Sequence, residues 1–126
     1  MAYGDIGGVI TELIITCQAP ATGDVAISKG DAVALADNYT VTNATSAEDA
    51  LFGQAMADAS ANGQHIPVKV RGVCTFAYTG TAPTVNGAAG VVASDTAGSV
   101  KAPASGNGKG VNLSVDSTAS EVQVLL

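Results

Sequence analysis

The stretch LFGQAMADASANGQHIPVKVRGV, from Leu51 to Val73, decides how the chain is interpreted. A short apolar run at 52–57 and a longer Val-rich run at 65–78 flank a polar break that contains a glycine. Small apolar residues before a Gly-bearing turn, and β-branched residues at alternate positions after it, predict two antiparallel strands. Gly53 argues against a helix, because a glycine inside a helix costs about 1 kcal/mol relative to alanine.

The same pattern of alternating apolar residues, interrupted by Gly, Asn, Asp and Pro, predicts further short strands along most of the chain. These strands are expected at residues 8–16, 24–27, 31–36 and 39–42. Pro67 lacks a backbone N–H and therefore places the start of the strand at 65–78 at a sheet edge or a bulge. Ser46 and Asp49 form a helix-capping pattern, which we limit to one helical turn at most, at 46–50.

Glycines and valines recur at fixed offsets, which indicates an internal repeat. Two pairs of glycines share one offset in the numbering (87 − 30 = 110 − 53), and two pairs of valines share a slightly shorter one (122 − 68 = 124 − 70). The corresponding pairs are Gly30 with Gly87, Gly53 with Gly110, Val68 with Val122 and Val70 with Val124. A strand fits both copies, because Val111, Leu113 and Val115 alternate in the second copy as they would in a strand.

The predicted fold is all-β: a small β-barrel or β-sandwich built from two similar hairpin units, at about 29–72 and 87–126, with an extended N-terminal arm. The length of 126 residues fits a single domain. Within it we expect an N-terminal arm or strand at 1–22 and a β core with the internal repeat at 23–126. Hydrophobic residues make up 47% of the chain but aromatic residues only 4%, so each core side chain buries little area. A partner surface is therefore expected to add stability.

The charge pattern argues against nucleic acid and membranes as partners. The formal net charge is −6 and the five basic residues are dispersed, whereas nucleic-acid binding needs a basic stripe. The longest uncharged window, between Arg71 and Asp95, contains the turn-rich sequence TGTAPTVNGAAG, which does not suit a membrane helix. No basic segment precedes the first apolar run, so we expect no export signal and synthesis in the cytoplasm.

Reactive groups are few, so we expect no catalytic, cofactor or metal site and no enzyme. His65 is the only histidine, whereas a zinc site usually needs three or four ligands. The GNGKG stretch is not a phosphate-binding loop, because Pro103 and Gly110 stand where that motif needs a glycine and a Ser or Thr. Cys17 and Cys74 could form one disulfide, but two buried thiols are the favoured interpretation in a reducing compartment.

The order and spacing of several segments resemble one known family. The segments GDAVALAD, FGQAMADASANGQHIPVKVRGV and AAGVVASDTAGSVKAPASGNGKGVNLSVDSTASEVQVLL resemble the capsid cement, or head decoration, proteins of tailed bacteriophages. The matching positions are Gly30, Asp31, Val33, Gly53, Ala55, Gly63, Val68, Val70, Gly72, Gly110, Val122, Val124, Leu125 and Leu126. The resemblance covers residues from about 29 to 126; Gln54 and the segment 87–89 depart from the family pattern.

This resemblance implies a structural virion protein that binds the outer surface of the expanded phage head and stabilises it. Its implied partner is the major capsid protein, and its implied assembly is a homotrimer at local three-fold positions. Two alternatives remain: a tail-associated or extracellular β adhesion module, and a small enzymatic or sugar-binding β domain. Scarce aromatic residues and an apolar N-terminal segment supply the candidate capsid or subunit contacts, which are Tyr3, Ile6, Leu13, Ile14, Ile15, Phe76 and Tyr78.

Overall fold

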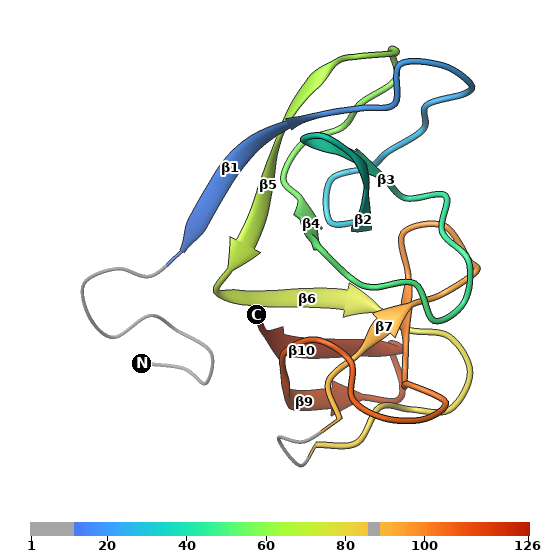
Figure 1. Cartoon of the computed structure of the whole chain (residues 1–126). Coiled ribbons are helices and arrows are strands. Elements are labelled where there is room, and N and C mark those ends of the chain that lie inside the picture. Colours follow the sequence, from blue (N-terminus) through green and yellow to red (C-terminus); the bar gives the residue numbers. More distant parts are fainter. Residues whose placement is uncertain (1–11, 86–88) are drawn as a thin grey trace.

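The computed structural model describes residues 12–85 and 89–126, which form β-strands joined by turns and contain no helix (Figure 1). The strands are β1 (Leu13–Gln18), β2 (Ala32–Asp37), β3 (Thr40–Thr42), β4 (Gly53–Ala55), β5 (His65–Arg71), β6 (Val73–Ala77), β7 (Val92–Ala93), β8 (Val100–Lys101), β9 (Val111–Asp116) and β10 (Glu121–Leu125). The all-β prediction is confirmed. A helix able to cross a membrane is absent from the described residues.

Five strands close into a small barrel in the order β1-β3-β2-β4-β5, and β1 completes the barrel by pairing with β5. This antiparallel pairing runs from Leu13 opposite Arg71 to Gln18 opposite His65. On its other side, β1 pairs with β3 only where Gln18 lies opposite Thr40. The barrel wall is therefore continuous on one side of β1 and closed by a single residue pair on the other.

Inward-facing residues of the barrel strands form the first of two hydrophobic cores. Val33, Ile66 and Val68 are fully buried in it, and the Cys17 thiol lies among them. Burial raises the pKa of Cys17. Cys74 is also a free thiol, but it is buried in the second core, so the interpretation of two buried thiols is confirmed.

The long strand predicted at 65–78 is two strands, because Gly72 has a φ of 122° and turns the chain between β5 and β6. After this turn β6 runs across the lower end of the barrel and joins a three-stranded sheet in the order β6-β10-β9 (Figure 1). Lys69, which is buried, holds the corner: its Nζ donates to the Glu12 carboxylate at 3.0 Å and to the Val73 carbonyl at 3.1 Å.

Pro67 lies within the barrel wall and not at a sheet edge, because β5 has β1 on one side and β4 on the other. The Pro67 carbonyl accepts a hydrogen bond of 2.9 Å from the backbone N–H of Met56. In an antiparallel pair the missing N–H of Pro67 would point toward the same residue. Since β4 ends at Ala55, the proline costs no ladder hydrogen bond within that strand.

The two hairpin units share their strand pairing. In the first unit, the register between β2 and β4 sets Ala32 opposite Gln54 and Val33 opposite Gly53. In the second unit Val91 pairs with Lys109, which is the next pair along the same register once the offset of the repeated glycines (87 − 30) is applied. The antiparallel pair of β4 and β5 likewise corresponds to that of β9 and β10.

The predicted alignment of the last strand in each unit is wrong by two positions. Strand pairing sets Ala55 opposite Val68 in the first unit and Asn112 opposite Val124 in the second. Because Asn112 follows Ala55 at the same offset as the glycines (112 − 55 = 110 − 53), Val124 corresponds to Val68 and not to Val70. Apolar residues alternate with a period of two, so a shift by two positions preserves the pattern and the sequence could not reveal it.

The strand predicted at 24–27 is absent. Only Ile27 makes a β-bridge, with Ala59, and the residues before it form no ladder. The strand predicted at 8–16 is described only from residue 12 onward, where β1 begins at Leu13. The predicted arm at 1–22 therefore contains a barrel strand, and residues 1–11 lie outside the described part of the chain.

The segment at 46–50 is a tight turn and not a turn of helix. The backbone N–H of Asp49 donates to the Ser46 carbonyl at 3.2 Å, and the Asp49 carboxylate accepts the Ser46 N–H at 2.8 Å. Glu48, between them, has a φ of 75°, which no α-helix contains. The predicted capping partners do interact, but they close a turn.

Side-chain hydrogen bonds link the barrel half of the chain to the second half. The Glu48 carboxylate accepts hydrogen bonds from the Lys101 ammonium and, at 2.9 Å, from the Ala104 N–H. The Gln54 amide donates to the Thr75 carbonyl at 2.8 Å. The two cores are therefore joined at several points besides Gly72.

The Glu48 linkage predicts a pH-dependent contribution to stability. The hydrogen bond from Lys101 lowers the pKa of Glu48 in the fold, so the pair stabilises the protein above the unfolded-state pKa and loses this effect as the pH falls through the folded-state pKa. Glu48→Gln should lower the melting temperature at pH 7. In acid, the melting temperatures of the variant and the unaltered protein should converge. Asp24→Asn, an exposed control, should show no such convergence, and parallel melting curves for Glu48→Gln and the unaltered protein at all pH values would contradict the prediction.

Gly53 predicts a steric test of the hairpin. A Cβ at this position would lie 2.5 Å from the Lys69 carbonyl oxygen and 2.9 Å from Val68 Cγ1. Gly53→Ala should therefore lower the free energy of unfolding by about 1–3 kcal/mol in urea titrations. The exposed control Ser60→Ala should change it by less than about 0.5 kcal/mol, and an equally small effect of Gly53→Ala would show that β4 and β5 do not approach this closely.

Candidate binding site

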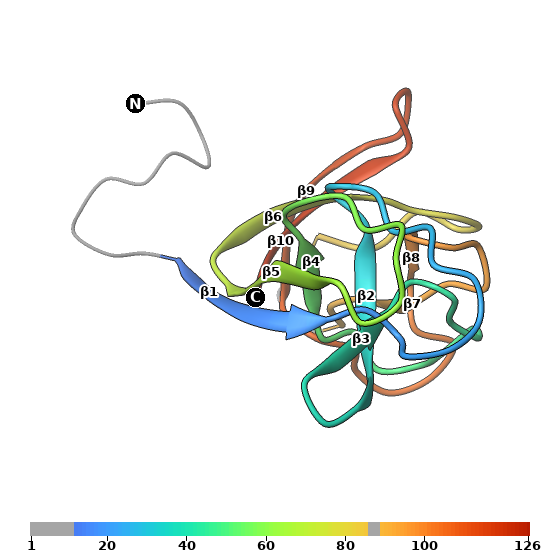
Figure 2. The same ribbon diagram turned by 90° about the horizontal axis from the view of Figure 1, so that it is seen from above.

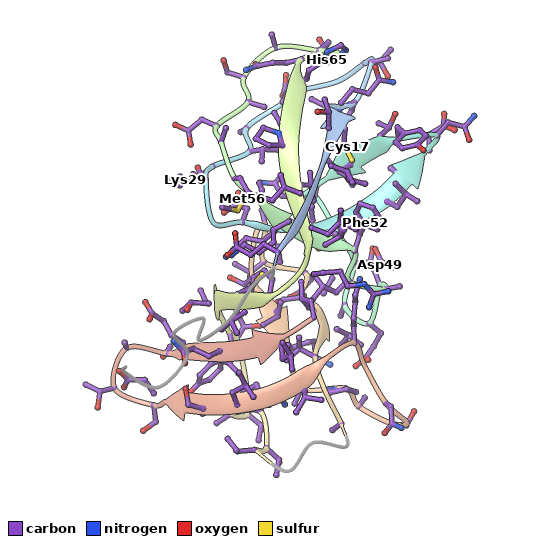
Figure 3. All side chains as sticks on the ribbon, turned by 90° about the vertical axis from the view of Figure 1, so that its left-hand side faces the viewer. Cys17, Lys29, Asp49, Phe52, Met56 and His65 are labelled. Atoms are coloured by element: carbon purple, nitrogen blue, oxygen red, sulfur yellow. The ribbon has the colours of Figure 1, made fainter. Side chains whose placement is uncertain are left out.

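The described residues contain no grouping of side chains suited to metal binding. No three His, Cys, Asp or Glu residues in 12–85 and 89–126 come together. His65 stands exposed at the outer end of β5, well apart from Asp49 and Met56 (Figure 3).

An apolar hollow lies where the barrel is closed by a single pair, between β1 and the β2–β3 hairpin. The turn of this hairpin projects from the barrel beside the end of β1 (Figure 2). The volume of the hollow is about 580 Å³, within the usual range for ligand pockets. Its lining residues are Ile15, Leu35, Ala36, Asp37, Asn38, Tyr39 and Phe52.

Two large side chains stand exposed at the hollow. Leu35 is 52% exposed and Tyr39 is 70% exposed. Exposed aromatic residues that keep an apolar body and a polar tip are typical anchors of protein interfaces. The hollow therefore presents the kind of surface that a protein partner covers.

Tyr39 is also held in an unfavourable backbone conformation. Its φ is 48°, in the left-handed region, which costs a residue with a Cβ about 1–2 kcal/mol relative to the right-handed one. Its carbonyl is fixed by the backbone N–H of Gln18 at 2.8 Å. Strained residues of this kind are concentrated at functional positions, so the observation supports a role for the hairpin tip beyond stability.

Phe52, which lines the hollow, is contacted by a lysine from the second half of the chain. Lys109 Nζ donates to the Phe52 carbonyl at 2.8 Å and lies 5.7 Å from the centre of the Phe52 ring. Burial, with a smaller effect from the nearby Arg71, lowers the pKa of Lys109. A cation over an aromatic face is attracted to it, so Lys109 orients the ring that closes the hollow.

Three of the predicted contact residues lie on β1, next to this hollow. Leu13 is 50% exposed and Ile14 is 44% exposed, while Ile15 is half-buried and lines the hollow while packing on the barrel core. Tyr3 and Ile6 lie outside the described residues.

The two predicted contacts on and after β6 are placed differently. Phe76 is only 1% exposed and belongs to the second core, so its assignment as a surface contact is wrong. In a chain with few large side chains, an inward-facing phenylalanine is needed to fill the core. Tyr78 is half-buried against the same core.

Sequence reasoning missed three large side chains that line the hollow, Leu35, Tyr39 and Phe52. Leu35 belongs to a regular apolar alternation, which predicts a strand but no surface contact. The missed signal was the Asn38–Tyr39 turn, because a tight hairpin turn usually carries glycine where this chain has a tyrosine.

A second exposed apolar group lies on the three-stranded sheet. Val111 and Leu125 face each other across β9 and β10 and are 37% and 44% exposed. Leu113 on β9 is 40% exposed. None of these three side chains lines the hollow between β1 and the hairpin, so they serve as a control surface.

Comparison with known proteins adds no relative to this description. No protein-family model matches the chain, and a search of curated proteins finds no match. The resemblance to capsid decoration proteins therefore stays a prediction from the residues quoted above.

Tyr39 predicts an unusual response to substitution. Tyr39→Asn should leave the free energy of unfolding unchanged or raise it by up to about 1 kcal/mol in urea titrations, because asparagine tolerates a positive φ. Tyr78→Asn is the matched control and should destabilise the protein, since Tyr78 packs against the second core. A loss of more than about 1 kcal/mol for Tyr39→Asn would show that Tyr39 is retained for packing.

Proposed function

We propose that the protein is a structural virion protein, a capsid decoration protein that binds the outer surface of the expanded head of a tailed phage. The observation that carries this proposal is the apolar hollow, an open surface with an exposed, strained tyrosine and, among the described residues, no metal-binding group around it. Such a surface suits protein binding. The resemblance of residues 29–126 to decoration proteins supplies the identity of the partner, the major capsid protein.

The proposed action is stabilisation by binding and requires no chemical step. A protein that binds the expanded shell but not its unfolded or unexpanded forms stabilises the expanded state in proportion to RT ln(1 + [L]/Kd). A homotrimer at local three-fold positions would add avidity, because several copies engage a fixed lattice together. Both effects use surfaces of modest area, which fits a chain with few aromatic residues.

Substitution at the hollow tests the proposal. Purified protein should co-sediment saturably with undecorated expanded heads of the phage that encodes it, and should raise their melting temperature, but should not bind procapsids. Leu35→Asp should weaken binding at least tenfold, because covering a carboxylate with apolar surface is unfavourable. Leu113→Asp, a comparably exposed leucine on the three-stranded sheet, should bind normally.

Several results would count against the proposal. Absence of binding to expanded heads would overturn it and favour the adhesion-module alternative. Unchanged binding of Leu35→Asp would show that the hollow is not the contact surface, and equal losses for Leu35→Asp and Leu113→Asp would show that binding is not confined to it. Melting curves of both variants exclude unfolding as the cause.

A further inference from the structure

We infer that the occupant of the hollow is an extended segment of the shell protein, which adds as a β-strand to the edge of β1 that faces away from β5. The inference rests on the proposed function, because it names the form in which that partner binds. It follows from three properties of the described residues: the direction of the backbone groups of β1, the side chains of the hollow and the charge at its rim.

The backbone of β1 offers hydrogen-bonding groups on this side. The Ala19 N–H donates to the Gln64 carbonyl next to β5, whereas the Gln18 N–H donates to the Tyr39 carbonyl next to β3, each at 2.8 Å. Since successive residues of a strand direct their N–H and C=O groups to opposite sides, those of Ile14 and Thr16 point away from β5. Among the described residues, no strand pairs with β1 there, because β3 reaches only Gln18.

The side chains beside this edge suit a strand that carries apolar residues at alternate positions. Ile15 lines the hollow from β1, Leu35 and Tyr39 line it from the hairpin, and Phe52 lines it from the segment before β4. In strand addition, backbone hydrogen bonds supply affinity and pockets for alternate side chains supply specificity. The edge and the hollow lie together here, so one extended segment can use both.

Charge restricts the sequence of the segment. Asp37 is the one charged residue that lines the hollow, and the described residues give it no ion-pair partner. The net charge of −6 repels acidic segments further. We therefore expect the segment to be neutral, or to carry a lysine or arginine where it passes Asp37.

Thr16 allows a test that removes a single backbone donor from the edge. Thr16 lies opposite Pro67 in the β1–β5 pairing, at a position where its N–H points away from β5. Thr16→Pro therefore deletes an N–H on the open edge and leaves the hydrogen bonds to β5 in place. Thr16→Val is the matched control, because it keeps the N–H and replaces the hydroxyl by a methyl group.

In co-sedimentation with expanded heads, Thr16→Pro should bind at least tenfold more weakly than the unaltered protein, and Thr16→Val should bind normally. Unchanged binding of a folded Thr16→Pro would overturn the inference and leave the proposed function standing. Failure of the unaltered protein to bind heads would overturn both.

A second measurement uses the unaltered backbone, in case Thr16→Pro does not fold. Hydrogen exchange of the Ile14 and Thr16 amides should slow at least tenfold when the protein is bound to heads, and unchanged exchange would overturn the inference. A photoreactive residue in place of Leu35 should cross-link to a segment of the shell protein. A cross-link to residues 1–11 of this chain, in the same or a neighbouring copy, would overturn it by identifying a different occupant.

Discussion

The one-sided pairing of β1 is the constraint on which the rest of the structure depends. β5 holds β1 along its length, and this pairing brings a segment near the start of the chain into the wall of the barrel. The same strand meets β3 at one residue only. The same strand therefore closes the barrel, through its pairing with β5, and leaves an opening in the wall, because it pairs with β3 at one residue only. The candidate site lies at this opening.

Small side chains set the second constraint. The fully buried residues of both cores are mostly valines, with one phenylalanine and one isoleucine as the largest members. Because such cores bury limited apolar area, polar interactions contribute a larger share of the stability. These interactions are made by the buried Lys69 at the corner of β5 and β6, by Lys109 at the Phe52 ring, and by Glu48 in its turn. Each link joins the barrel half of the chain (12–71) to the second half (72–126), so the two cores are held together by more than the chain connection at Gly72.

Much of the fold could be predicted from local pattern, because alternation and turn residues are properties of short segments. The strands around Gly53 and Gly63, the all-β class and the offset that the two hairpin units share all follow from such signals. The break at Gly72 and the register of Val124 could not be predicted, since a glycine does not reveal which way the chain turns and a shift of two positions keeps every apolar side chain facing inward.

The site was harder to predict than the fold for a related reason. The apolar segment at 13–15 is a local signal, and these residues are exposed or half-buried on β1. Scarcity of aromatic residues predicts a contact at Phe76, but for the same reason Phe76 fills the core. Tyr39 lines the hollow because its φ is positive and because β1 lies beside the hairpin. Neither property can be predicted from the residue type.

The presence of one cysteine in each core has a consequence for how the molecule can be observed. Cys17 reports on the barrel and Cys74 on the layer under the three-stranded sheet, and burial raises the pKa of both thiols. Each thiol can therefore be alkylated only when its own half of the molecule opens. The alkylation rates of Cys17 and Cys74 thus report the opening of the two halves. Comparing these two rates reveals whether the halves open separately or together.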